Sequence, residues 1–187
     1  MKRTLSLVLL ILLAITVAAQ IQEVPFTQVH LDDSFWAPRI EVNRTVSIPS
    51  AFQECEKSGR FDNFVLAAIN NGKQPTVSGK WSMVNGQWQT ADGQPLEHRG
   101  DFSFDDTDPY KVIEGASYAL AANYDAQLDH YLDSVISIIA LAQEDDGYLT
   151  TCVTNKCTRL SGWWGTHRWE KLNSHEIYNS GHLIESA

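Results

Sequence analysis

The last stretch of the sequence holds two histidines whose spacing could build a ligand-binding surface. His175 and His182 are seven residues apart, close to two turns of a helix, so we expect them on the same side. A neutral imidazole can both donate a hydrogen bond to a ligand hydroxyl and accept one from it. The spacing differs from the four-residue spacing of zinc proteases. We therefore predict that both histidines contact a ligand; the alternative is that either one caps or packs the helix.

Three carboxylates, those of Asp105, Asp106 and Asp108, lie immediately before a predicted helix. The helix dipole stabilises negative charge there, so we expect at least one of them to cap the helix. Asp106 is also a candidate for contact with a substrate or a metal at the mouth of a cleft. Pairs of carboxylates can hydrolyse glycosidic bonds, but a chain with 23 acidic residues contains many such pairs by chance.

The three cysteines are Cys55, Cys152 and Cys157. In an oxidising compartment Cys152 and Cys157 could close a short disulfide loop, which would leave Cys55 free or buried. The alternative for the same pair is a zinc site. The sequence shows no second Cys/His pair at ligand spacing, so we predict no metal site on these residues alone.

Hydrophobic periodicity predicts a mainly α-helical protein. Pro38 is predicted to start the first helix after an aromatic anchor, Phe35–Trp36, and Asp125 is predicted to cap the second helix of a hairpin. A capping box formed by Asn173 and Glu176 would start the last helix at Asn173 or Ser174. The expected helices are 39–58 (interrupted at Pro49), 61–69, the hairpin 109–145, and the run that begins at 173 or 174.

Residues 70–100 are predicted to be a long loop or a small insertion, and residues 148–172 another loop, because glycine, proline and polar residues interrupt them. Trp81 and Trp88 in the first loop could stack on sugar rings or simply pin the loop to the body of the domain. Helical hairpins joined by long loops are typical of an α/α solenoid or toroid, in which the loops build a cleft on one face.

The N-terminus has the pattern of a secretory signal peptide. Basic residues at positions 2 and 3 precede an apolar run, and small residues precede Gln20, so residues 1–19 are predicted to be removed. The run is too short for an ordinary membrane span, although an uncleaved anchor is the alternative. We expect residues 20–187 to be secreted and extracellular, with no membrane association after cleavage.

Charge excludes one class of partner. The formal net charge is −9, and it becomes −11 once Lys2 and Arg3 are removed. A chain this acidic repels phosphate backbones, so we do not expect it to bind nucleic acid. Asn43 begins the triplet Asn43-Arg44-Thr45, an N-glycosylation sequon that would be used only in a eukaryotic secretory pathway.

The C-terminal helix has no visible stop signal. Neither glycine nor proline follows Glu185 before the sequence ends at Ala187. We therefore expect the chain to be a fragment of a larger protein, and its folding alone to be hindered by uncovered apolar helix faces.

Five segments, in the same order, resemble the β-L-arabinofuranosidase-like glycoside hydrolases of family 127. The third corresponds to the family's Asp-Ser-Asp-Val-Tyr-Lys-Trp-Ile-Glu block, and the last to its His-Glu-Leu-Tyr…Gly-His-x-x-Glu-Ala helix. The departures are Pro109, Val112 and Ser186. The segments are Val29–Arg39, Ser58–Phe64, Asp106–Ala116, Ala142–Leu149 and His175–Glu185.

The resemblance implies that residues 20–187 are the N-terminal portion of the catalytic domain, an incomplete (α/α)6 barrel. It implies a retaining glycosidase that binds arabinofuranoside-containing glycans, with His175 contacting the sugar. The family's acid/base glutamate, its cysteine nucleophile and its zinc ligands belong to later segments. Zinc is therefore expected in full-length relatives, no cofactor is expected in this fragment, and the fragment alone is expected to be inactive. The alternative is a secreted, non-catalytic carbohydrate-binding or scaffold protein.

Overall fold

The computed structural model describes residues 22–75, 80–157, 163 and 165–187. The predicted signal peptide, residues 1–19, lies outside the described residues. The chain divides into two compact units, residues 1–31 and 32–187. The described part of the first unit holds a short 3-10 helix, η1 (Phe26–Gln28). Among the described residues, no helix is both long enough and apolar enough to cross a membrane.

The second unit begins with a continuous helical run made of α2 (Trp36–Val42), the π-helical turn η2 (Asn43–Ser47) and α3 (Ile48–Lys57). Asp33 starts the run by accepting hydrogen bonds from the backbone N–H groups of Phe35 and Trp36. The wider π-helical turn directly precedes Pro49, which has no N–H to donate to a regular helical turn. The predicted helix 39–58 is thus confirmed, with an earlier start.

Two predictions on this run differ from the structure or stay open. Phe35 and Trp36 were expected to anchor the helix, but both side chains are more than half exposed. That prediction is wrong for the described residues, because the two rings pack on each other and Phe35 on Arg39, while both stay largely open to solvent. Asn43 of the sequon is exposed on η2. Its glycosylation stays a prediction.

Helix α4 (Arg60–Asn70) follows after a single left-handed residue, Gly59, whose φ is 75°. Glycine adopts this conformation without the steric penalty of a side chain, so the chain can turn sharply between the helices. The predicted helix 61–69 is confirmed. Its expected apolar face is buried in the core: Phe61, Phe64, Val65 and Ala68.

Residues 70–100 were predicted to form a long loop or a small insertion, and the loop alternative is wrong for part of the segment. Strands β1 (Trp81–Val84) and β2 (Gln87–Thr90) form an antiparallel hairpin. The turn is Asn85-Gly86, with φ values of 51° and 82°, which is the dipeptide that tight hairpins favour. Trp81 pins the hairpin to α4, because its ring is buried and its Nε1–H donates to Asp62 at 2.7 Å.

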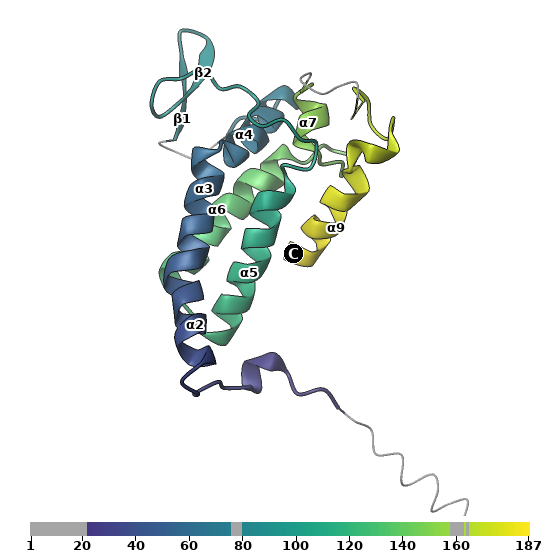
Figure 1. Cartoon of the computed structure of the whole chain (residues 1–187). Coiled ribbons are helices and arrows are strands. Elements are labelled where there is room, and N and C mark those ends of the chain that lie inside the picture. Colours follow the sequence, from purple (N-terminus) through teal and green to yellow (C-terminus); the bar gives the residue numbers. More distant parts are fainter. Residues whose placement is uncertain (1–21, 76–79, 158–162, 164) are drawn as a thin grey trace, which may run out of the picture. The chain divides into compact units, whose positions relative to one another are not determined.

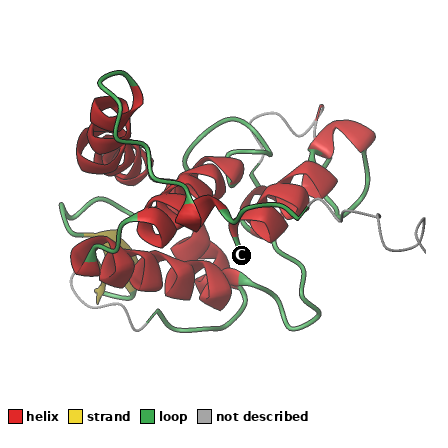
Figure 2. Ribbon diagram, turned by 90° about the horizontal axis from the view of Figure 1, so that it is seen from below, coloured by secondary structure: helices red, strands yellow, loops and turns green. Residues whose placement is uncertain are grey.

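The predicted hairpin of helices is confirmed as α5 (Thr107–Ala122) and α6 (Ala126–Ala142). Asp125 caps α6 as expected, since its carboxylate accepts from the N–H groups of Gln127 and Leu128. In the core α4 packs on α6, while α5 packs on α3 (Figure 1). Figure 2 shows the helices with the small two-stranded sheet at one side.

The last part of the chain contains α7 (Thr151–Thr154), the 3-10 turn η3 (Leu172–Ser174) and α9 (Glu176–Ser186), and α9 packs beside α5. Helix α7 lies in the segment predicted to be a loop. The last helix begins at Glu176, later than predicted, because His175 has a left-handed backbone with φ 60° that a helix cannot include.

Replacing Asp125 with alanine should lower the free energy of unfolding by about 1 kcal/mol, since the N–H groups at the start of α6 lose their acceptor. Asp133→Ala is the matched control, because Asp133 is exposed on the same helix and makes no cap. Its expected change is under about 0.5 kcal/mol. Urea unfolding followed by circular dichroism measures both, and equal losses would contradict the capping role.

Candidate functional site

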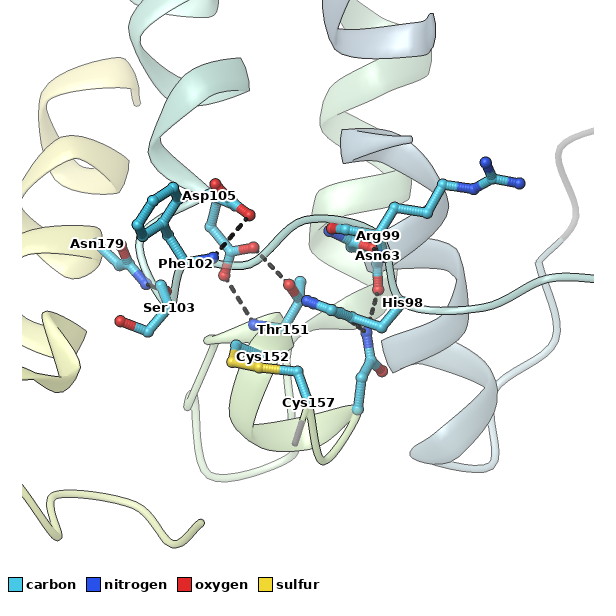
Figure 3. The surroundings of a disulfide bond; sticks show 12 residues. Asn63, His98, Arg99, Phe102, Ser103, Asp105, Thr151, Cys152, Cys157 and Asn179 are labelled. Atoms are coloured by element: carbon cyan, nitrogen blue, oxygen red, sulfur yellow. Dashed lines mark hydrogen bonds between the residues drawn. A yellow bond between two sulfur atoms is a disulfide. The ribbon is translucent and has the colours of Figure 1, made fainter. Parts of the chain in front are cut away.

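An irregular loop, residues 98–106, leads from the hairpin to α5. In the described part of the chain its backbone forms hydrogen bonds with buried side chains and not with a neighbouring strand. The Asn63 side chain of α4 donates to the Arg99 carbonyl at 2.8 Å and accepts from the Arg99 N–H at 2.7 Å. The Asn179 side chain of α9 donates to the Ser103 carbonyl at 2.8 Å. Figure 3 shows these side chains along the loop. The loop therefore determines where α4 and α9 lie relative to α5.

Asp106 closes this loop from the other side and is fully buried. Its carboxylate accepts from the Thr151 N–H at 2.7 Å and from the Thr151 hydroxyl at 2.5 Å. Asp106 thus caps α7, and no side chain of the acidic cluster caps α5 in the described structure. The predicted capping of α5 is wrong, because Asp105 accepts from the Phe102 N–H and Asp108 pairs with Arg60 instead.

Burial raises the pKa of Asp106 to about 6, with a further contribution from the neighbouring charge of Asp105. The Thr151 hydrogen bonds and the Arg60 charge act in the opposite direction but do not overcome the burial. Both carboxylate oxygens are already bonded to Thr151. Contact between Asp106 and a substrate stays a prediction, and the role that the structure gives this residue is to join α5 to α7.

His175 lies at the junction between η3 and α9, half-buried, in the left-handed conformation. Such a conformation is uncommon for a residue other than glycine and costs about 1 kcal/mol or more, so the surroundings must impose it. The imidazole Nδ1 lies 2.5 Å from the Asn173 carbonyl oxygen. The ring also packs edge-on against Phe104, with centroids 4.9 Å apart.

Glu176, the next residue, is held by several hydrogen bonds. It is buried, and its carboxylate accepts from the Trp169 N–H at 2.8 Å and the Ser174 hydroxyl at 2.6 Å, as well as from the Tyr148 hydroxyl. Burial and this hydrogen bond raise the pKa of Tyr148, so its hydroxyl remains a donor. The predicted capping box is wrong, because Glu176 bonds to these groups and His175, not Asn173, precedes the helix.

His175, just before α9, and Tyr178 and His182 within α9 are joined by ring contacts, although His175 lies outside the helix that the spacing argument assumed. The Tyr178 ring lies 6.1 Å from that of His175 and 4.6 Å from that of His182, edge-on to both. From α5, Lys111 donates to the Tyr178 hydroxyl at 2.9 Å. We call these four residues, together with Phe104, the α5–α9 polar surface. Sequence reasoning missed Lys111, Tyr178 and Phe104 as members of this surface. The helical spacing of Tyr178 from both histidines could have indicated it, whereas Lys111 and Phe104 reach the histidines only through tertiary packing.

A second set of polar groups continues this surface. Glu114, His182 and Glu185 place one oxygen, one nitrogen and one oxygen within 4.8 Å of one another. Glu185 is largely exposed, and its carboxylate lies 3.8 Å from His182 Nδ1. The second cluster of metal-ligand type in the described residues is formed by His98, Cys152 and Cys157.

Of the two alternatives for the Cys152 and Cys157 pair, a disulfide or a zinc site, the structure has the disulfide. Cys152 and Cys157 form a disulfide with a Cα–Cα distance of 5.0 Å, and Cys55 is buried as a thiol whose pKa burial raises to about 11. Neither of the two described clusters combines cysteine sulfur with a glutamate oxygen. The residues that the structure describes therefore do not fit the zinc ligand set that the resemblance implies for full-length relatives.

The raised pKa of Asp106 predicts a specific pH dependence. Its ordinary value of 3.8 applies when the chain is unfolded, and about 6 applies when it is folded. Between these values the folded chain binds more protons, so this group's contribution to the free energy of unfolding rises as pH falls. The free energy of unfolding of the wild type minus that of Asp106→Asn should therefore increase by about 1–3 kcal/mol as the pH falls from about 7 to about 4.

Urea unfolding at a series of pH values measures this difference. Because the other titratable groups are present in both proteins, their contributions cancel in the subtraction. Asp133→Asn, the loss of an exposed carboxylate, is the control and should parallel the wild type. If the free energies of unfolding of the wild type and Asp106→Asn differed by the same amount at every pH, burial would not raise the pKa of Asp106.

Comparison with known proteins identifies the family of the chain. Residues 28–187 match the family described as β-L-arabinofuranosidase, GH127 catalytic domain. A non-reducing end β-L-arabinofuranosidase from Bifidobacterium longum subsp. longum is 43% identical over 86 residues, which are 45% of this chain and 12% of that protein.

Two solved structures are similar over most of the chain. A GH127 β-arabinofuranosidase aligns with a TM-score of 0.67 and 44% identity, over 88% of this chain and 23% of its own. A GH127 β-L-arabinofuranosidase from Geobacillus stearothermophilus T6 aligns with a TM-score of 0.64 and 31% identity, over 85% of this chain and 21% of its own. This chain thus spans less than a quarter of the length of each of these relatives. It belongs to the GH127 β-L-arabinofuranosidase family.

Proposed function

We propose that this chain is the N-terminal part of the catalytic domain of a secreted glycosidase that releases β-L-arabinofuranose from glycans or glycoproteins. The family match over residues 28–187 supports the class of enzyme, and the printed names of the relatives support the sugar. We further propose that the described helices are the first part of an (α/α)6 barrel. The packing of α3, α5 and α9 side by side, with α4 and α6 behind them, is compatible with this arrangement.

The observation that carries the proposal is the α5–α9 polar surface. Sugar hydroxyls both donate and accept hydrogen bonds, and the apolar face of a sugar ring packs well on aromatic rings. This surface offers the imidazoles of His175 and His182, the Lys111 ammonium and the rings of Phe104 and Tyr178. Such a combination suits a neutral, hydroxyl-rich ligand better than an anion or an apolar one.

His175 is the residue that we expect to contact the sugar most directly. The rings of Phe104 and Tyr178 pack edge-on against it, so its imidazole is oriented before a ligand arrives. Nδ1 faces the Asn173 carbonyl, which favours the tautomer with a proton on Nδ1. Nε2 is then an acceptor for a sugar hydroxyl.

We propose that this part of the domain binds and orients the sugar. The retaining chemistry, with its cysteine nucleophile, acid/base glutamate and zinc, would be supplied by segments that relatives carry further along the chain. The isolated chain should accordingly show no turnover of 4-nitrophenyl β-L-arabinofuranoside. Release of 4-nitrophenol by the purified chain would contradict this division of roles.

Binding tests the sugar-contact role directly. Methyl β-L-arabinofuranoside titrated into the chain should shift the NMR signals of the His175 ring. His175→Ala should weaken binding by about tenfold, the loss of one hydrogen bond worth about 1 kcal/mol or more. His130→Ala is the matched control, because His130 is exposed on α6. Equal binding of methyl α-D-glucopyranoside, or no effect of His175→Ala, would contradict the proposal.

A further inference from the structure

Three groups that bind zinc well meet beside the irregular loop. His98 lies in the segment that follows the hairpin, Cys152 is on α7, and Cys157 follows α7 after a short turn (Figure 3). One imidazole nitrogen and the two sulfur atoms all lie within 4.8 Å of one another. The turn keeps the cysteines together, since the Cys157 N–H donates to the Cys152 carbonyl at 2.8 Å. Thiolates and imidazole are the donors that zinc prefers in proteins.

The His98 imidazole has one nitrogen engaged and one left for a ligand. Nδ1 lies 3.2 Å from the Asn155 side-chain nitrogen. Nε2 is buried, and it has no hydrogen-bond partner among the described residues. A buried polar nitrogen without a partner is unfavourable unless something binds to it. Burial lowers the pKa of His98 to about 4, with a smaller contribution from the Arg60 charge, so the ring is neutral at ordinary pH. Neutral imidazole is the form that binds metals.

We propose that His98, Cys152 and Cys157 form a zinc site when the cysteines are reduced, and that the Cys152–Cys157 disulfide is its oxidised, metal-free form. An external dithiol or phosphine supplies the two electrons and two protons that convert the disulfide into two thiols, and is itself oxidised. Zn²⁺ then replaces the two thiol protons, which pass to the solvent. The proton of the neutral His98 ring moves from Nε2 to Nδ1 by exchange with the solvent, and Nε2 donates its lone pair to the metal. Three protein ligands leave the fourth position of a tetrahedral zinc for water.

The charge of the site favours this assignment. Two thiolates and one Zn²⁺ sum to zero, so the complex places no net charge in a region where Cys152 is buried. The neighbouring Arg60 charge disfavours a second positive charge on the imidazole, and this keeps the lone pair of the ring available. The site does not use the residues of the α5–α9 polar surface, so the inference is independent of the proposed activity.

Asn155 sets the affinity of this site. For Nε2 to bind zinc, the neutral ring must hold its proton on Nδ1, yet the Asn155 amide nitrogen that faces Nδ1 is itself a donor. The same nitrogen donates to the Asn63 carbonyl at 2.8 Å, so the amide is held in this orientation. An acceptor at position 155 would favour the tautomer that binds metal. Asn155→Asp should therefore tighten zinc binding by about tenfold, within the range found for hydrogen-bond partners of metal ligands.

Cobalt provides the test, because Co²⁺ replaces zinc and reports its ligands by colour. The full chain, reduced with a phosphine under anaerobic conditions, should bind one Co²⁺ and show a thiolate-to-cobalt charge-transfer band. Tetrahedral d–d bands should accompany it, and Zn²⁺ should bleach both. The oxidised chain should show neither band. The absence of the charge-transfer band in the reduced wild type, with its fold verified by circular dichroism, would overturn the proposal.

Variants separate this site from binding by cysteines elsewhere. Cys55→Ser is the matched control and should keep the cobalt spectrum, whereas Cys157→Ser should lose the charge-transfer intensity. His98→Gln should weaken zinc binding by about 100-fold, since loss of a ligand exceeds the effect of its partners. A second measurement covers variants that fold poorly: zinc should protect Cys152 and Cys157 of the wild type from alkylation. If zinc protected the cysteines of His98→Gln from alkylation as well as those of the wild type, His98 would not be a zinc ligand, which would overturn the proposed site.

Discussion

The backbone of the loop from residue 98 to residue 106 is largely without helix or sheet, so side chains must satisfy the polar groups that it buries. An unpaired buried N–H or C=O costs about 1–3 kcal/mol, which makes each of these contacts a strong constraint. Asn63 bonds to both backbone groups of Arg99, and Asn179 bonds to the Ser103 carbonyl. Asp106 completes the set through Thr151. These contacts join α4, α5, α7 and α9, and the remaining geometry follows from them.

This constraint explains why both candidate sites lie at the same end of the helices. The Asn179 contact holds α9 against the loop, and Glu176 holds the segment just before α9, so His175 is placed beside Phe104. The Asp106 contact holds α7, which carries Cys152, against the segment that carries His98. The proposed sugar-binding surface and the proposed zinc site therefore share one buried network but use separate side chains as ligands.

The α5–α9 polar surface lies at a solvent-exposed edge of two packed helices. Lys111 and Tyr178 are both exposed there and form a hydrogen bond with each other. The sequence retains polar and aromatic groups there, and the ring contacts among His175, Tyr178 and His182 orient them. This is the pattern expected where a helix pair presents a surface to a ligand.

Local features of the chain could be predicted from the sequence because their causes are local. Helical periodicity predicted α4, α5 and α6 with their buried faces, and Asp125 was recognised as a cap from the residues beside it. The five family segments predicted the enzyme class. The hairpin was also predictable, since Asn85-Gly86 is a strong turn signal that the loop prediction overlooked.

The tertiary structure decided the contacts between residues distant in sequence. Asp106 looked like a cap for the helix that follows it, but burial against Thr151, 45 positions away, made it the cap of α7. The left-handed His175 directly precedes the buried Glu176, whose carboxylate accepts from Tyr148, 28 positions away. The cysteine pair alone lacked a third metal ligand, and only the folded loop brings His98 to it. Sequence patterns report how a segment satisfies its own backbone, whereas the partners of a buried polar side chain are determined by which segments pack together.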